Sequence, residues 1–162
     1  MQEAERVATL KSYGILDTPN EPDFDRLVRA MAHSFGVPRA LISFIDDDRQ
    51  WYKARVGVAA TFVPRAISFC THSIGTDAVT VTLDARLDAR FCDNPFVAED
   101  GGVRFYAAAP IKAPNRARIG TVCVFDSSPR EAMVQADLDK LPVFADQVSA
   151  LLERRRMTAK PN

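Results

Sequence analysis

VRFYAAAPI (residues 103–111) and RIGTVCVF (residues 118–125) are two runs rich in β-branched or apolar residues, and they predict the two clearest β-strands in the later part of the chain. The turn-forming residues Ala113-Pro114-Asn115-Arg116 lie between the runs, so we expect an antiparallel hairpin. Within the first strand, the adjacent aromatic residues Phe105 and Tyr106 must face opposite sides of the sheet. One of them is therefore expected in a core packed by helices, and the other on the second face.

Three further segments have strand character. Residues 40–45 and 50–56 flank a polar turn and predict a second hairpin, and residues 79–83 are rich in β-branched residues. Residues 84–101 are rich in Asp, Asn, Pro and Gly, and they predict a loop region with one or two helical turns. The two hairpins indicate antiparallel pairing throughout.

Helical patterns occupy both ends of the chain. Helices are predicted over residues 3–13 and 21–35, which end at Gly14 and Gly36. In the last helix an apolar stripe recurs at heptad-like spacing: Val134, Leu138, Leu141, Ala145, Val148 and Leu152. Pro142 removes a backbone hydrogen bond there, so we expect a kink or a split near residue 141. The order of elements predicts an α+β domain with helices packed on a central antiparallel sheet.

Length and composition exclude several classes of protein. The chain has 162 residues, 47% hydrophobic and 26% charged, with 21 basic and 21 acidic residues that cancel. This balance argues against nucleic-acid binding, which needs a basic surface. Three cysteines without CxxC spacing fit a reducing cytoplasm, and we expect a cytoplasmic location with no signal peptide and no membrane span.

Several motifs together resemble one family. They are residues 13–19 (YGILDTP), 24–25, 45–57, 68–74 (SFCTHSI), 84–91, 94–95, 104–110 and 120–124 (GTVCV). This set is similar to the GAF domain superfamily, in particular to GAF modules of bacterial sensor histidine kinases and diguanylate cyclases. The resemblance covers residues 5–155.

The resemblance carries several implications. It implies a GAF/PAS-like sheet of five or six strands, with the N- and C-terminal helices on one face and a ligand pocket on the other. It also implies a homodimer through the terminal helices, for which we expect contacts from Leu138, Leu141, Val148 and Leu152. A histidine kinase or diguanylate cyclase is a possible effector domain outside this chain. We divide the chain into an N-terminal helix and connector (1–20), the GAF domain (21–157) and a tail (158–162).

Residues 68–74 place a thiol two residues from an imidazole. Ser68 is a plausible N-cap for a short helix over residues 69–75, where Cys70 would lie in the first turn. Cys70 and His72 are either ligand contacts or packed core residues, and a redox role is a third reading. Because residues at i and i+2 do not share a helix face and no pair has zinc-site spacing, we expect no metal site.

Other side chains could complete a pocket. The aromatic residues on the hairpins either pack in the core or line the pocket: Phe44, Trp51, Phe105 and Tyr106. The charged residues of the loops and strand edges either form surface ion pairs or orient a polar ligand: Asp84, Asp88 and Arg104. We expect ligand contacts from Phe44, Trp51, Ser68, Cys70, His72, Asp84, Arg104, Tyr106 and Cys123. No catalytic residue and no particular cofactor is indicated.

The predicted function is a non-catalytic sensory GAF domain that binds a small molecule in bacterial signal transduction. Two alternatives are a dimerisation module whose pocket its own side chains fill, and a cysteine-dependent free methionine sulfoxide reductase. Spacing of the three cysteines disfavours the reductase, and the position of Cys70-Thr71-His72 disfavours bilin attachment.

Overall fold

The computed structural model describes residues 1–159 and contains one six-stranded sheet. The strands follow the order β3-β2-β1-β6-β5-β4, and every neighbouring pair is antiparallel. Their bounds are β1 (Arg39–Ile45), β2 (Arg49–Val56), β3 (Phe62–Pro64), β4 (Thr80–Thr82), β5 (Phe105–Lys112) and β6 (Arg118–Asp126). The predicted α+β fold with an antiparallel sheet is confirmed.

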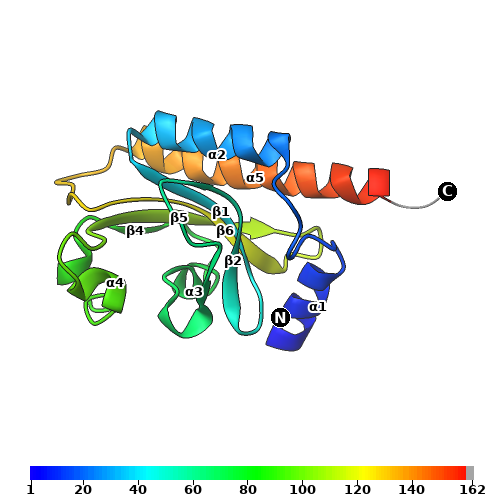
Figure 1. Cartoon of the computed structure of the whole chain (residues 1–162), viewed down its shortest axis with the longest axis horizontal. Coiled ribbons are helices and arrows are strands. Elements are labelled where there is room, and N and C mark those ends of the chain that lie inside the picture. The colour runs from blue at the N-terminus through cyan, green and yellow to red at the C-terminus, as the bar shows by residue number, and fades with distance from the viewer. Residues whose placement is uncertain (160–162) are drawn as a thin grey trace.

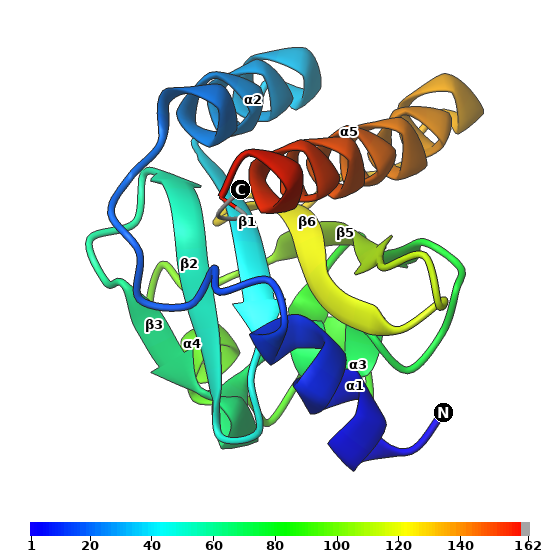
Figure 2. The same cartoon turned by 90° about the vertical axis from the view of Figure 1, so that its right-hand side faces the viewer.

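Helices cover the sheet unequally. The long helices α2 (Pro22–Phe35) and α5 (Gln135–Ala159) lie side by side on one face (Figure 1). Helix α1 (Glu3–Lys11) lies instead near one end of β1 and β6 (Figure 2). The opposite face carries the short helices α3 (Cys70–Ser73) and α4 (Pro95–Ala98), with the 3-10 turns η1 (Arg65–Ile67) and η2 (Ala85–Leu87).

The face under α2 and α5 is a continuous apolar core. Pro22 occupies the first turn of α2, and Gly36 ends the helix with a φ of 61°, which a residue with a Cβ adopts at a cost. Between them, Phe24, Val28 and Met31 are buried against the sheet. The core includes Leu10, Tyr13 and Ile15 from the N-terminal twenty residues, so these pack as part of the same unit.

The apolar stripe of α5 faces this core. Leu141, Val148 and Leu152 are at most 2% exposed, and Leu138 is half-buried. The prediction that Leu141, Val148 and Leu152 form a dimer contact was therefore wrong, because the helix-side core already buries them. For Leu138, which is not part of that core, the contact stays a prediction. Heptad-like spacing alone does not tell which surface a stripe packs against.

Helix α5 runs unbroken through Pro142, so of the predicted kink or split near residue 141 the split was wrong, and the kink stays a prediction. Buried contacts of Leu141 and Ala145 hold both sides of the proline and offset its missing hydrogen bond. The helix also continues to Ala159, inside the tail predicted over 158–162, whose last three residues lie outside the described part. Within residues 1–159, none of the helices combines the length and apolar character needed to cross a membrane.

Candidate functional site

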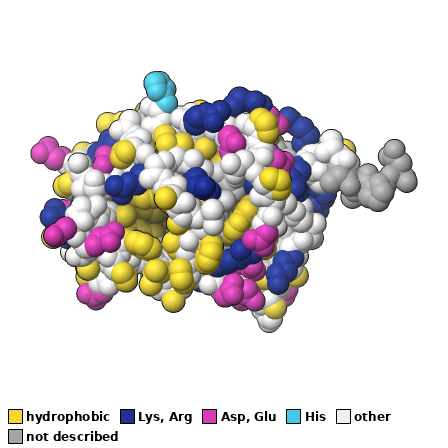
Figure 3. All heavy atoms as spheres, in the orientation of Figure 1, with side chains coloured by type: hydrophobic (Ala, Val, Ile, Leu, Met, Phe, Trp, Pro, Cys, Tyr) yellow, Lys and Arg dark blue, Asp and Glu magenta, His cyan; other side chains and the backbone are white. Residues whose placement is uncertain are grey.

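A cavity of about 460 Å³ lies on the face of the sheet opposite α2 and α5. Figure 3 shows the surface hollowed there, with hydrophobic side chains lining the hollow. We call its buried lining residues the floor: Leu41, Gln50, Tyr52, Ser68, Phe69, Cys70, Val103, Tyr106 and Cys123. We call its partly exposed lining residues the mouth, chiefly Arg39, Val58, Phe96, Glu99 and Phe125.

Strand alternation decides which side chains reach the cavity. On β1, Leu41 belongs to the cavity side and Ile42 to the core under the helices. Phe105 and Tyr106 divide in the same way, as predicted: Phe105 packs under the helices, and Tyr106 lies on the floor. The cavity is therefore lined by the strand side chains that point away from the core under the helices.

Strand β2 contains a β-bulge beside the cavity. Ala54 pairs with Ile42 and Tyr52 with Ser43, so Lys53 is the extra residue between them. Tyr52 points into the cavity, whereas the Lys53 ammonium is buried on the other side. There it donates hydrogen bonds to Thr18, Pro19 and Glu21 in the connector between α1 and α2.

A buried hydrogen-bond network fixes the floor. Ser68 Oγ donates to Gln50 Oε1 at 2.6 Å, and Gln50 Nε2 donates to Ser43 Oγ at 3.0 Å. Ser43 Oγ lies 3.0 Å from Thr121 Oγ1, and Ser68 Oγ also accepts from the Thr71 amide at 3.3 Å. The last bond joins Ser68 to the second residue of α3, although the N-cap position of this helix is Phe69 and not Ser68 as predicted. These bonds hold α3 against strands β1, β2 and β6.

Two thiols lie side by side on the floor. Cys70 Sγ is 3.0 Å from Tyr106 Oη, which is 2.8 Å from Ser73 Oγ. Burial raises the pKa of the Cys70 thiol, but hydrogen bonds from Cys123, Thr121 and Tyr106 outweigh it and lower the pKa. The pKa of Cys123 is raised well above its ordinary value by its hydrogen bond to Cys70 and by burial. Cys70 therefore has the more acidic thiol of the two.

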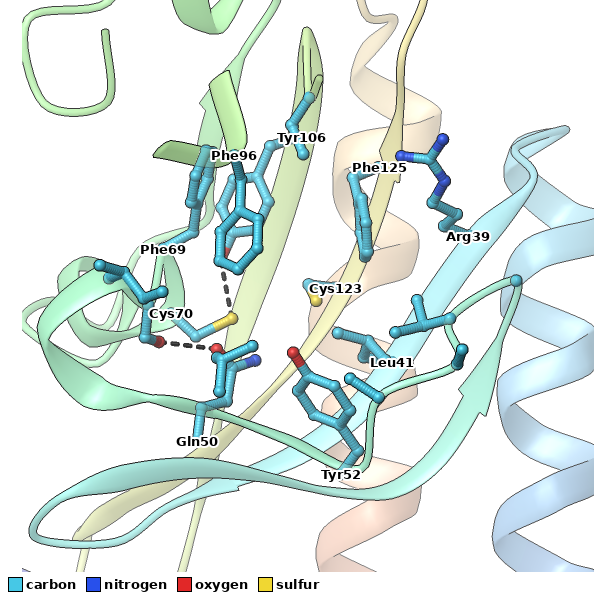
Figure 4. A pocket seen from close by; sticks show the side chains of 18 of the residues that line it. Arg39, Leu41, Gln50, Tyr52, Phe69, Cys70, Phe96, Tyr106, Cys123 and Phe125 are labelled. Atoms are coloured by element: carbon cyan, nitrogen blue, oxygen red, sulfur yellow. Dashed lines mark hydrogen bonds between the residues drawn. The ribbon is translucent and has the colours of Figure 1, made fainter. Parts of the chain in front are cut away.

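Tyr52 differs from the other polar residues of the floor. Its side chain is 7% exposed, and its hydroxyl has no hydrogen-bond partner among residues 1–159. Figure 4 shows this hydroxyl directed toward the space where the sulfur atoms of Cys70 and Cys123 lie. Burial raises the pKa of Tyr52, and the nearby thiols Cys123 and Cys70 raise it further. The Tyr52 hydroxyl is therefore neutral and can donate a hydrogen bond.

Four of the nine predicted site residues line the cavity: Ser68, Cys70, Tyr106 and Cys123. Phe44 and Trp51, 0% and 6% exposed, instead pack in the core under the helices. Their placement in a pocket was wrong, because strand alternation turns both rings away from the cavity.

The remaining three predicted residues also lie outside the cavity. His72 is exposed, and its ring meets the edge of Phe91 at 5.3 Å. Asp84 Oδ2 pairs with Arg86 at 2.6 Å, and Arg104 Nη1 donates to the Val97 carbonyl at 2.6 Å. Asp84 thus forms the surface ion pair that the sequence left open, whereas Arg104 bonds backbone carbonyls of the loop region and forms no ion pair within the described residues.

Sequence reasoning missed Gln50 and Tyr52 on the floor and Phe96 and Phe125 at the mouth. The signal for Tyr52 was present, because it alternates with Trp51 and one of the two had to face the cavity. Phe96 lies in a loop region, where no periodicity assigns a direction.

Within the described residues, one group of at least three potential metal-ligating side chains lies close enough to share a cation: Asp46, Asp47 and Asp48 in the β1–β2 turn. Two of the three are exposed, and Arg49 Nε lies 3.6 Å from Asp46 Oδ2. The Arg49 guanidinium is therefore a positive charge that the protein itself places beside these carboxylates.

Comparison with known proteins agrees with this architecture. Residues 21–152 match the family model of the GAF domain, and the chain belongs to this family. It is 36% identical over 156 residues, 96% of its length, to a cyclic di-GMP phosphodiesterase of Pseudomonas aeruginosa. The chain spans about a quarter of that relative, 27% of its length.

Solved structures extend the likeness of fold. The GAF domain of a phosphoenolpyruvate-protein phosphotransferase from Acinetobacter superposes with a TM-score of 0.70 at 14% identity, and 100% of each chain is covered. A free methionine-R-sulfoxide reductase from Neisseria meningitidis, solved with its substrate, gives 0.68 at 14% identity, covering 96% of this chain and 93% of the other. At such identities the likeness concerns the fold alone.

Proposed function

We propose that this chain is a non-catalytic regulatory GAF module that binds a small molecule in the cavity opposite α2 and α5. The observation that carries the proposal is a space of about 460 Å³ lined by the hydroxyl of Tyr52, which has no hydrogen-bond partner among residues 1–159. Concave, mainly apolar sites of a few hundred Å³ with a small number of polar groups are typical of small-molecule binding. The proposed ligand contacts are Ser68, Cys70, Tyr106 and Cys123 together with Gln50 and Tyr52.

The relative from Pseudomonas aeruginosa supports a place in bacterial signalling. It is a cyclic di-GMP phosphodiesterase, and this chain is similar to about a quarter of it. We infer that occupation of the cavity regulates a signalling effector, of which a phosphodiesterase, a histidine kinase or a diguanylate cyclase is an example. The proposed location is the cytoplasm.

The experiment is native mass spectrometry of the purified chain, beside a variant with a blocked cavity. Leu41→Phe adds bulk at the floor, and Val143→Phe adds the same ring on α5, where Val143 is 56% exposed. We expect a bound small molecule on the wild type and on Val143→Phe, and its loss from Leu41→Phe. Equal retention by a folded Leu41→Phe variant contradicts binding in this cavity.

A second candidate function is a cysteine-dependent reductase of free methionine sulfoxide. The observation in its favour is the position of Cys70 beside Cys123, where hydrogen bonds lower the pKa of Cys70. A thiol with a lowered pKa is the better nucleophile. Consumption of free methionine sulfoxide with dithiothreitol as reductant, abolished by Cys70→Ser, would favour this candidate over the non-catalytic module.

The homodimer is also part of the proposal, with contact residues other than Leu141, Val148 and Leu152. Met157 on α5 is 74% exposed, so it remains available for a contact with a second copy of the chain. Sedimentation of the wild type and of Met157→Asp tests this. A wild type that stays monomeric at high micromolar concentration contradicts it.

A further inference from the structure

We propose that the cavity takes an uncharged, planar molecule of a few fused rings that carries a carbonyl or hydroxyl group, and that Tyr52 Oη hydrogen-bonds to that group. The inference rests on the proposed function, because it assigns a class of ligand to the same cavity. Three properties of the cavity carry it: its unsatisfied polar atoms, its charge and its shape.

The unsatisfied polar atoms lie together on β2. Tyr52 as a whole residue is 7% exposed, and its hydroxyl reaches the open space of the cavity and has no partner within the described residues. Gln50 is 3% exposed, and its Nε2 donates one of its two hydrogens, to Ser43. A ligand oxygen near Tyr52 would therefore satisfy a donor that the protein leaves open.

The floor carries no charged side chain among the residues described. Its polar groups are hydroxyls, thiols and one amide, and burial raises the pKa of both Tyr52 and Tyr106. An ionised ligand group there would lose its hydration without gaining a counter-ion, which is costly. At the mouth, Arg39 and Glu99 have opposite charges and both reach solvent, so neither sign is favoured.

The walls favour a flat apolar body. Figure 4 shows Phe96 and Phe125 on opposite sides of the space above the floor, and both are half-buried. Phe69 of the floor adds a further aromatic ring, which is held in place by stacking on Phe91 with ring centroids 4.4 Å apart and an angle of 2°. Aromatic rings bind well between such faces in offset-stacked or edge-to-face contact. A volume of about 460 Å³ admits a ligand of a few rings.

The experiment measures the affinity of the full chain for two probes of nearly the same shape, 2-naphthamide and 2-naphthoate, by isothermal titration calorimetry. We expect the neutral amide to bind about 10-fold or more tightly than the carboxylate, because only the carboxylate must be desolvated without a counter-ion. Tyr52→Phe should weaken binding of the amide about 3- to 10-fold, the usual net value of one hydrogen bond. Tyr13→Phe is the matched control, because Tyr13 bonds Glu153 away from the cavity and should leave affinity unchanged.

The outcomes separate this inference from the proposed function. Equal or tighter binding of the carboxylate overturns the uncharged ligand class, and an unchanged affinity in Tyr52→Phe overturns the role of Tyr52. In both cases, if Leu41→Phe abolishes binding of the probe, the result still supports a ligand site in the cavity. If neither probe binds the wild type, the inference is wrong, and the absence of any co-purifying molecule then counts against the proposed function as well.

Discussion

The two faces of the sheet are built from the same strands but have different compositions. Under α2 and α5 the buried cluster consists of apolar side chains, with the Lys53 ammonium at its margin. The cavity side buries Ser43, Gln50, Ser68, Ser73 and Thr121 and leaves a space of about 460 Å³. Because stability comes mainly from apolar burial and close packing, the helix side is expected to hold the fold together. The cavity side is less closely packed, and its space is where we propose that a ligand binds.

The largest effect is expected from truncation on the helix side. Leu141→Ala removes a fully buried side chain and should lower the free energy of unfolding by about 2–5 kcal/mol. Val143→Ala, two residues along α5 and exposed, should change it by about 0.5 kcal/mol or less. Urea unfolding followed by circular dichroism measures both. A loss below about 1 kcal/mol in Leu141→Ala would remove the contrast between the two faces.

A medium effect should distinguish adjacent residues on β1. Ile42→Phe overfills the packed core and should cost about 1–3 kcal/mol, whereas Leu41→Phe extends into the cavity and should cost much less. Thermal and urea unfolding of the two variants, measured in parallel, give the comparison directly. Equal losses would mean that the cavity collapses in solution and that both faces are equally packed.

The smallest effect concerns electrostatics outside both faces. Hydrogen bonding to Arg6, with a further contribution from Arg65, lowers the pKa of Glu3 from 4.5 to about 2. The folded state therefore binds this proton more weakly than the unfolded state, so stability is present above about pH 4.5 and is lost as the pH falls toward 2. Glu3 is half exposed, so the contribution is about 1 kcal/mol or less.

Unfolding free energies of the wild type and Glu3→Gln at neutral pH and near pH 3 measure this contribution. The difference between the two proteins should shrink as the pH falls. Glu5→Gln is the control, because Glu5 is exposed on the same helix. A constant difference across the pH range would show that Glu3 acts by some means other than its charge.

Much of the fold could be predicted because alternation and helical periodicity are local. The β1–β2 and β5–β6 hairpins lie where the sequence places them, within a residue or two. Strand β3 was missed, because three residues ending in Pro64 carry no periodic signal and a proline is tolerated on an edge strand. The stripe of α5 was found, but its partner was misassigned, since periodicity marks an apolar face without naming what covers it.

The site was predicted less completely, for a related reason. Alternation shows that Trp51 and Tyr52 face opposite sides, but only the tertiary arrangement decides which side is hollow. The larger ring was assigned to the pocket, and the structure buries it under the helices instead. Ser68 and Cys70 were assigned to the pocket from local residue types at a helix start, and both line the cavity; their contact with a ligand stays a prediction.

The hydrogen bonds of Lys53, the extra residue of the bulge, limit where this chain can be truncated. Glu21 receives hydrogen bonds from both Lys53 and Arg155, so one carboxylate ties the sheet to the far end of α5. The family match covers residues 21–152 and so excludes Thr18, Pro19 and Arg155. A fragment trimmed to those limits would leave the Lys53 ammonium with one of its three partners and would uncover the core beneath Leu10 and Ile15. The cooperative unit of folding is therefore longer than the segment by which the family is recognised.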